Sequence, residues 1–124
     1  MKSPEDMTIL VVDDEDMLRE IVTMQIEEDG YKVLQACSGN EAFETIKQTH
    51  IDLVISDMRM PDGSGEDLLR SINTLDIKPK FIMITGYSEL SKEDLVALGA
   101  LDMLAKPIDF DLLDKYIQET LASL

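Results

Sequence analysis

The chain has 124 residues, the length of one ordinary domain, so a second folded domain of usual size does not fit. Its 11 Lys and Arg residues against 26 Asp and Glu residues give a net charge of −15, which repels nucleic-acid phosphates and anionic membranes, so direct nucleic-acid binding is not expected. A hydrophobic content of 44% excludes an intrinsically disordered acidic chain, and a single cysteine excludes an internal disulfide.

Five apolar segments predict strands, and segments with helical spacing alternate with them. In chain order the strand segments are residues 8–12, 31–36, 53–56, 81–85 and 101–104. Four of them are nearly continuous apolar runs rich in Val, Ile and Leu, as in strands that are buried on both faces of a parallel sheet. The segment 31–36 is mixed in composition, so we expect it nearer an edge of the sheet.

Apolar residues at helical spacing lie between these segments. They are Leu18, Ile21 and Val22; Leu68, Ile72 and Leu75; and Leu113, Tyr116, Ile117 and Leu121. Boundary signals agree with this spacing. Asp29-Gly30 suits a helix end, and residues 38–41 predict a capping box in which the Ser38 side chain and the Glu41 side chain each accept a backbone amide. Ser91 and the two acids at 93–94 predict the start of a fourth helix.

This alternation predicts an α/β fold, a doubly wound sheet of five parallel strands with five helices, because right-handed crossovers then cover both faces. In such sheets the functional crevice lies beyond the carboxyl ends of the strands. Residues that carry chemistry are therefore expected just after the strand segments.

Carboxylates, a hydroxyl and an amine occur at these strand ends. Asp13 and Asp14 follow the first strand, Asp57 the third, Thr85 ends the fourth, and Lys106 follows the fifth. Three neighbouring carboxylates repel one another unless a cation joins them, and Mg²⁺ prefers oxygen ligands. With Lys106 and Thr85 the set suits stabilisation of a phosphoryl group. Each residue alone could be a helix cap, a turn or a surface charge, but their ordered occurrence at four strand ends favours a site.

The same residues lie in recognisable motifs. These are residues 9–15 (ILVVDDE), residues 57–61 (DMRMP) with Gly65 eight residues after Asp57, Thr85-Gly86, Gly99-Ala100 and Lys106-Pro107. Over essentially its whole length the sequence resembles the receiver domain of bacterial two-component response regulators, the CheY-like family. The resemblance implies a flavodoxin-like sheet in the order 2-1-3-4-5, and a cis peptide before Pro107 that aims Lys106 inward.

The resemblance also implies a role for each site residue. Asp57 is the implied phosphoacceptor, Thr85 the switch hydroxyl and Lys106 the phosphoryl contact, while Mg²⁺, with Mn²⁺ as a substitute, is held by Asp13, Asp14, Asp57 and the backbone carbonyl of Arg59. The implied donor is a sensor histidine kinase or phosphotransfer protein. The implied output is a downstream protein or effector domain that binds through the fourth helix, fifth strand and fifth helix. Neither nucleic acid nor membrane is an expected direct partner, and a monomer or a phosphorylation-dependent dimer is expected.

The sequence departs from the family pattern at the switch. The family commonly has Tyr or Phe three residues before the conserved Lys, where this chain has Met103, which fills space but offers no ring or hydroxyl. Tyr87 could supply an aromatic at the site, or could be an exposed loop residue. Arg59 and Tyr87 are expected to flank the mouth of the pocket and to affect access of the hydrolytic water.

Several other residues are expected to carry no chemistry. His50 has no companion His or Cys, so it is interpreted as a surface loop residue. Cys37 and the eight Met residues are interpreted as core residues. The segment 63–65 (GSG) lacks the rest of a nucleotide-binding loop, so no nucleotide is implied.

Neither a membrane span nor a signal peptide is expected, since no apolar run approaches roughly 18 residues and the first residues lack a charged region followed by an apolar stretch. We expect a cytoplasmic receiver domain over residues 1–124, either free-standing or cut from a longer regulator. The leading hypothesis is a phosphorylation-controlled signalling module that catalyses only its own phosphorylation and dephosphorylation. The alternatives are a phosphorylation-independent interaction module, and a small phosphatase or phosphotransferase that acts on external substrates.

Overall fold

The computed structural model describes residues 2–86 and 90–124. Five parallel strands form one sheet in the order β2-β1-β3-β4-β5. Their bounds are β1 Thr8–Val12, β2 Lys32–Ala36, β3 Leu53–Asp57, β4 Lys80–Thr85 and β5 Asp102–Ala105. The predicted strand bounds are therefore confirmed to within one residue, and the fold is the flavodoxin-like doubly wound sheet.

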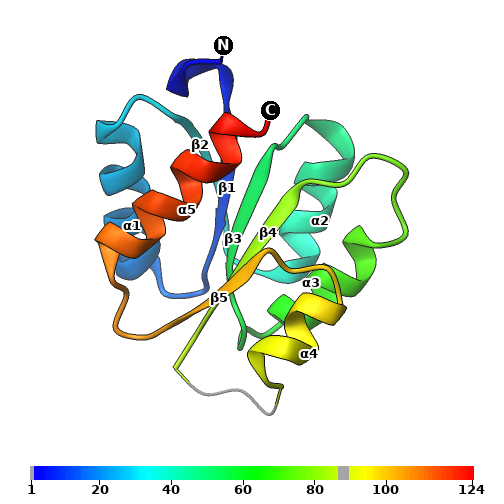
Figure 1. Ribbon diagram of the computed structural model, residues 1–124. Helices are drawn as coiled ribbons and strands as arrows, with labels where there is room; N and C mark the ends of the chain where they lie inside the picture. Colours follow the sequence, from blue (N-terminus) through cyan, green and yellow to red (C-terminus); the bar gives the residue numbers. More distant parts are fainter. Residues whose placement is uncertain (1, 87–89) are drawn as a thin grey trace.

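Helices cover both faces of the sheet (Figure 1). They are the short 3₁₀ helix η1 Pro4–Asp6 and the α-helices α1 Asp16–Glu28, α2 Gly39–Gln48, α3 Gly65–Ile72, α4 Lys92–Ala97 and α5 Phe110–Ala122. Helices α1 and α5 pack on one face and α2, α3 and α4 on the other, so each face has its own apolar core. Among the described residues, no helix is long and apolar enough to cross a membrane.

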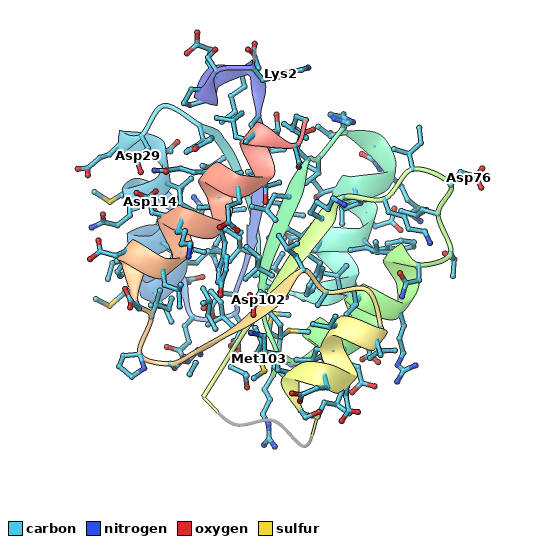
Figure 2. All side chains as sticks on the ribbon, viewed as in Figure 1. Lys2, Asp29, Asp76, Asp102, Met103 and Asp114 are labelled. Atoms are coloured by element: carbon cyan, nitrogen blue, oxygen red, sulfur yellow. The ribbon has the colours of Figure 1, made fainter. Side chains whose placement is uncertain are left out.

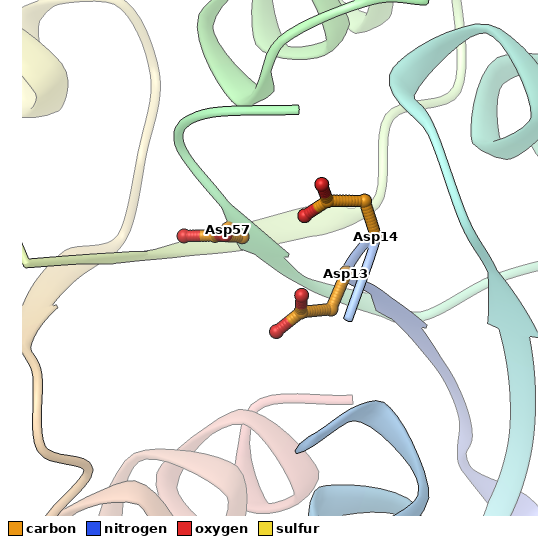
Figure 3. A group of neighbouring side chains, drawn as sticks. All are labelled: Asp13, Asp14 and Asp57. Atoms are coloured by element: carbon orange, nitrogen blue, oxygen red, sulfur yellow. The ribbon is translucent and has the colours of Figure 1, made fainter. Parts of the chain in front are cut away.

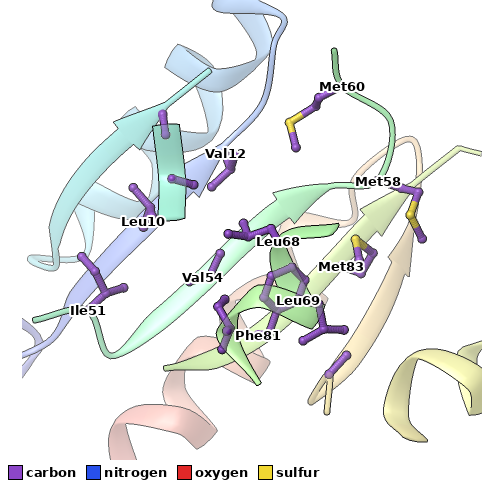
Figure 4. Packing of buried hydrophobic residues seen from close by; sticks show 14 of the residues in the cluster. Leu10, Val12, Ile51, Val54, Met58, Met60, Leu68, Leu69, Phe81 and Met83 are labelled. Carbon is purple, nitrogen blue, oxygen red and sulfur yellow. The ribbon is translucent and has the colours of Figure 1, made fainter. Parts of the chain in front are cut away.

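The alternation of side chains along each strand divides the apolar residues between the two cores. In β1, Leu10 and Val12 pack toward α2 and α3, whereas Ile9 and Val11 pack toward α1 and α5. Figure 4 shows the first of these cores, with Phe81 of β4 beside Leu68 and Leu69 of α3. Both sides of β1, β3 and β4 are thus covered by helices. This arrangement explains their continuous apolar runs.

Strand β2 lies at one edge of the sheet, which confirms the prediction from its mixed composition, and most of its residues are exposed. The helix boundaries also follow the sequence signals. Asp29 is the C-cap of α1, and Gly30 adopts a φ of 94°, a conformation that glycine reaches without steric cost. Ser91 and Asp94 form a reciprocal capping box at α4.

The box predicted at Ser38 forms only in part. The Ser38 side chain accepts the Glu41 amide, but a Glu41 carboxylate oxygen accepts the Cys37 thiol at 3.2 Å. Cys37 is exposed, so its interpretation as a core residue was wrong. Its place just beyond β2, at the edge of the sheet, explains the exposure.

The predicted helical segments are confirmed, but the structure differs at single residues. Helix α3 ends at Ile72, so Leu75 lies in the following turn. Ile21 of α1 is 47% exposed, and Met17 and Met24 of the same helix are more exposed still, so only some of the methionines are core residues. The spacing of Leu18, Ile21 and Val22 predicted a helix, but it did not show which of its apolar residues are buried.

Candidate functional site

The strand register brings the predicted site residues to one edge of the sheet. Val12 pairs with Ser56 and Thr85 with Ala105, while Asp57 pairs with Ile84, so the residues that end or follow β1, β3, β4 and β5 lie at the same level. The Lys106 amide donates to the Thr85 carbonyl at 3.0 Å, which extends this pairing beyond β5.

Three carboxylates converge at this edge. Asp13, Asp14 and Asp57 each offer an oxygen, and these oxygens lie within 4.8 Å of one another. Figure 3 shows the three side chains directed toward a common space from the ends of β1 and β3. Asp13 and Asp57 are buried, whereas Asp14 is exposed. A hard divalent cation fits this donor set, since Mg²⁺ takes carboxylate oxygens and retains water on its open side.

Burial and neighbouring negative charge make the ionised forms of Asp13 and Asp57 costly. Burial raises the pKa of Asp13, and the neighbouring charge of Asp57 raises it further against the hydrogen bond from the Glu15 amide. Burial likewise raises the pKa of Asp57, although the Lys106 ammonium and the Met58 amide oppose this change. Cations placed among the carboxylates would remove the repulsion.

Lys106 supplies one such cation. Its Nζ lies 3.2 Å from Oδ1 of Asp57, and the Lys106–Pro107 peptide is cis, as the resemblance implied. Burial alone would lower the pKa of Lys106, but the charge and hydrogen bond of Asp57 outweigh it, so the pKa is raised. The ammonium therefore stays charged beside the carboxylate.

The chain that follows Asp57 is held against α2. Amides of the first turn of α2 donate to this loop, from Gly39 to the Gly63 carbonyl at 2.8 Å and from Asn40 to the Asp62 carbonyl at 3.0 Å. A Cβ on Gly39 would lie 2.6 Å from the Gly63 carbonyl oxygen, closer than real Cβ contacts. Glycine at position 39 therefore allows the two backbones to meet. These hydrogen bonds restrain the loop of residues 58–64 where it contacts α2.

The other described residues singled out in the sequence lie outside the acidic cluster. Thr85 is buried at the end of β4, and Arg59 is exposed in the loop after Asp57. Met103 of β5 is half-buried and packs against the core under α2, α3 and α4, and Figure 2 places it beside Asp102 on that strand. Tyr87 lies outside the described residues. His50 is exposed, as predicted, and its Nε2 lies 2.8 Å from Asp52.

Sequence reasoning missed a polar network across α4, β5 and α5. Lys92 Nζ of α4 lies 3.0 Å from Asp102 Oδ1 of β5, and Tyr116 of α5 hydrogen-bonds to the same carboxylate. Burial alone would raise the pKa of Asp102, but the bonds from Tyr116 and Lys92 outweigh it and lower the pKa. The three residues are far apart in the sequence, so no local motif could have indicated the network.

Arg19 of α1 was also missed. Its guanidinium donates to the Asp13 carbonyl, the Gln35 side chain and the Asp16 carboxylate. The sequence signal, an Arg three residues after an Asp, is that of an ordinary surface ion pair on a helix. Only the structure reveals the contact with the main chain of a site residue.

Comparisons with known proteins agree with this geometry. Residues 9–118 match the family model described as the response regulator receiver domain. The chain is 36% identical over 121 residues to the transcriptional regulatory protein ZraR of Klebsiella oxytoca, covering 97% of this chain but only 27% of that protein. It is 34% identical over 104 residues to sporulation initiation phosphotransferase F of Bacillus subtilis, covering 83% of this chain and 84% of the relative.

A solved structure is similar over nearly the whole domain. The response regulator TrrA of Thermotoga maritima, crystallised with Mg²⁺ and BeF, matches with a TM-score of 0.83 and 34% identity, covering 93% of this chain and 99% of the other. The spatial arrangement of the strands and helices is thus shared with a protein that was solved with a divalent cation.

Proposed function

Because the chain belongs to the response regulator receiver family of two-component systems, we propose that it accepts a phosphoryl group from a histidine kinase onto Asp57. The observation that carries this proposal is the convergence of Asp13, Asp14 and Asp57 beside the Lys106 ammonium. Carboxylates that lie this close together repel one another, and a phosphoryl group with its counter-cation would account for their convergence.

In the proposed reaction, the Asp57 carboxylate attacks the phosphorus of a phosphohistidine. An oxygen–phosphorus bond of an acyl phosphate forms as the nitrogen–phosphorus bond of the donor breaks, and the leaving imidazole takes up a proton. Lys106 has two roles in this reaction. Before the transfer its charge favours the ionised form of Asp57, and during the transfer its ammonium contacts the phosphoryl oxygens. Water later hydrolyses the acyl phosphate, so the domain catalyses only its own phosphorylation and dephosphorylation.

A divalent cation, Mg²⁺ or its substitute Mn²⁺, would be held by the three carboxylates and the Arg59 carbonyl, and would neutralise charge on the phosphoryl oxygens. Arg59 directly follows the Asp57-Met58 pair, which supports this assignment of its carbonyl. The acidic cluster fits such an ion because its donors are all hard oxygen atoms.

We further propose that the Thr85 hydroxyl moves toward the phosphoryl group and that this movement alters the face formed by α4, β5 and α5. Thr85 ends β4, and its carbonyl accepts the amide of Lys106 just beyond β5, so the two elements would move together. Met103, which stands at the family's aromatic position, would repack without presenting a ring to a partner.

The donor would be a sensor histidine kinase or a phosphotransfer protein, and the recipient a downstream protein or effector domain. A net charge of −15 favours partners with basic rims and disfavours direct contact with nucleic acid or membrane. We propose a single receiver domain over residues 1–124, located in the cytoplasm with its donor and present as a monomer or as a phosphorylation-dependent dimer. Most of the length of ZraR lies outside the match, so the output of that relative does not transfer.

Intact mass after incubation with acetyl phosphate tests the proposal. Wild type and Asp57→Asn are compared with and without Mg²⁺. We expect one phosphoryl adduct, on wild type only and only with Mg²⁺, because an amide is not a nucleophile here. An adduct retained by Asp57→Asn would disprove the assignment of Asp57. No adduct on either protein, from acetyl phosphate or from a phosphorylated kinase, would favour the phosphorylation-independent interaction module.

A further inference from the structure

The guanidinium of Arg19 makes three hydrogen bonds at the amino-terminal end of α1. Nε donates to Gln35 Oε1 at 2.9 Å, Nη1 to the Asp13 carbonyl at 2.8 Å, and Nη2 to Asp16 Oδ1 at 2.8 Å. The side chain is only 14% exposed. Partners on β2, on the β1–α1 turn and on α1 thus fix the guanidinium plane from three directions.

The central bond acts on the peptide unit that joins two of the converging carboxylates. The carbonyl of Asp13 and the amide of Asp14 belong to one planar unit, so fixing the direction of that carbonyl restricts ψ of Asp13 and φ of Asp14. The Asp13 amide is held as well, since it donates to the Ala36 carbonyl at 3.1 Å. Arg19 therefore restrains the main chain from which both acidic side chains project.

The Asp13 side chain is restrained at its other end. Its Oδ1 accepts the Glu15 amide at 2.9 Å, which fixes the carboxylate relative to the same turn. Residues 14 and 15 of the turn between β1 and α1 are exposed, so the packing of their side chains does little to restrain it. Without the guanidinium, the Asp13–Asp14 peptide would have more conformations available, and the acids would pay an ordering cost when a cation binds.

We propose that Arg19 is a positioning residue for the cation site of Asp13, Asp14 and Asp57, acting through the carbonyl of Asp13. The inference rests on the proposed function, since it takes the converging carboxylates to be a divalent-cation site. A planar fork that makes three directed bonds is needed for this role, and a Lys ammonium at the same position cannot reproduce it. Charge alone is therefore not sufficient.

The test is a titration of the 124-residue chain with Mg²⁺ alone, followed by the amide shifts of residues 13–15 in two-dimensional NMR spectra. Arg19→Lys keeps the charge and removes the fork, and we expect about 10-fold weaker Mg²⁺ affinity, the lower end of effects seen when outer partners of metal ligands are removed. Gln35→Met removes only the Nε partner and should weaken affinity less. Arg70→Lys is the matched control, because Arg70 of α3 is exposed and forms a helical ion pair with half-buried Glu66.

Urea unfolding without Mg²⁺ separates positioning from folding. A positioning role predicts that Arg19→Lys binds Mg²⁺ more weakly even where its urea unfolding midpoint equals that of wild type. It also predicts that saturating Mg²⁺ restores the final level of phosphoryl adduct. Wild-type Mg²⁺ affinity in a folded Arg19→Lys protein would overturn the inference and leave the proposed function intact. Failure of wild type itself to bind Mg²⁺ at residues 13–15 would overturn both.

Discussion

Lys106 Nζ lies 3.2 Å from Asp57 Oδ1, so a buried acid at the end of β3 is paired with a cation supplied from beyond β5. The pair joins two strands that are separated by β4 in the sheet. Because the ammonium opposes the effect of burial on Asp57, it keeps more of this acid ionised than burial alone would allow.

Replacing Lys106 with Met should therefore slow phosphorylation. The variant loses both the cation that favours ionised Asp57 and the contact to the phosphoryl oxygens. We expect a fall of about 100-fold in the rate of adduct formation, as for other electrostatic contacts to a transferred group. The measurement is a time course of intact mass with acetyl phosphate and saturating Mg²⁺, with Lys115→Met on the exposed side of α5 as the control. Equal rates for the two variants would show that Lys106 has no part in the reaction.

Replacing Asp13 with Asn should stabilise the protein in the absence of divalent cations. The pKa of Asp13 is raised in the folded state, so the folded protein holds this proton more tightly than the unfolded chain does. That contribution to stability is complete below the unfolded pKa, near the ordinary value of 3.8, and is lost as the pH rises through the folded pKa. At pH 7 the ionised Asp13 is thus destabilising, and the amide removes this effect.

Thermal unfolding checks this prediction. At pH 7 without Mg²⁺ the Asp13→Asn variant should melt a few degrees above wild type, and the difference should shrink as the pH falls toward 4. Added Mg²⁺ should raise the melting temperature of wild type more than that of the variant, because ligand binding to the folded state stabilises it. A variant that melts below wild type at pH 7 would contradict the account of the acidic cluster.

Replacing Gly39 with Ala should destabilise the fold, because the added methyl group would lie 2.6 Å from the Gly63 carbonyl oxygen and the backbones would have to separate. We expect a loss of about 1–3 kcal/mol in the free energy of unfolding, the usual cost of overpacking. Gly86→Ala is the control, since its new Cβ would lie 3.7 Å from its nearest neighbours, an ordinary contact. Urea unfolding of both variants measures the difference, and similar losses would count against a close contact at Gly39.

The residues at positions 59 and 87 should lengthen the life of the phosphorylated state. Arg59 is exposed and follows Asp57 by two residues, and Tyr87 follows Thr85 by two residues in the sequence. A bulky cation and an aromatic ring at the mouth of the pocket would hinder the hydrolytic water. We expect Arg59→Asn/Tyr87→Ser to lose its phosphoryl group faster than wild type after acetyl phosphate is removed. Equal decay of the two adducts by intact mass would exclude this role.

The strand positions were predictable because a strand that is buried on both faces of a sheet needs a continuous run of apolar residues. The order of Asp13, Asp57, Thr85 and Lys106 along four strand ends indicated a candidate site for a related reason, since parallel strands end at the same edge of a sheet. The structure places Asp13, Asp14 and Asp57 together and pairs Lys106 with Asp57.

Other features depend on contacts between distant segments and left no local signal. Arg19 looks like half of a helical ion pair with Asp16, and its bond to the Asp13 carbonyl requires the chain to turn back at residues 14–15. The network of Lys92, Asp102 and Tyr116 requires two helices to meet at one strand. Cys37 was misjudged because a small apolar residue at the end of an edge strand can face either the core or the solvent.

The backbone contact between α2 and the loop after Asp57 gives the domain two unequal sides. Residues 62–63 are hydrogen-bonded to Gly39 and Asn40, so the loop is tied to α2. Under the proposed mechanism, we expect a rearrangement on phosphorylation to occur mainly toward β4 and β5. A ligand shifts a conformational equilibrium only by its differential affinity for the two states. Under the proposed mechanism, a protein that binds α2 and α3 would hold both forms equally well, as a constitutive tether does, whereas a protein that binds α4, β5 and α5 could respond to the signal.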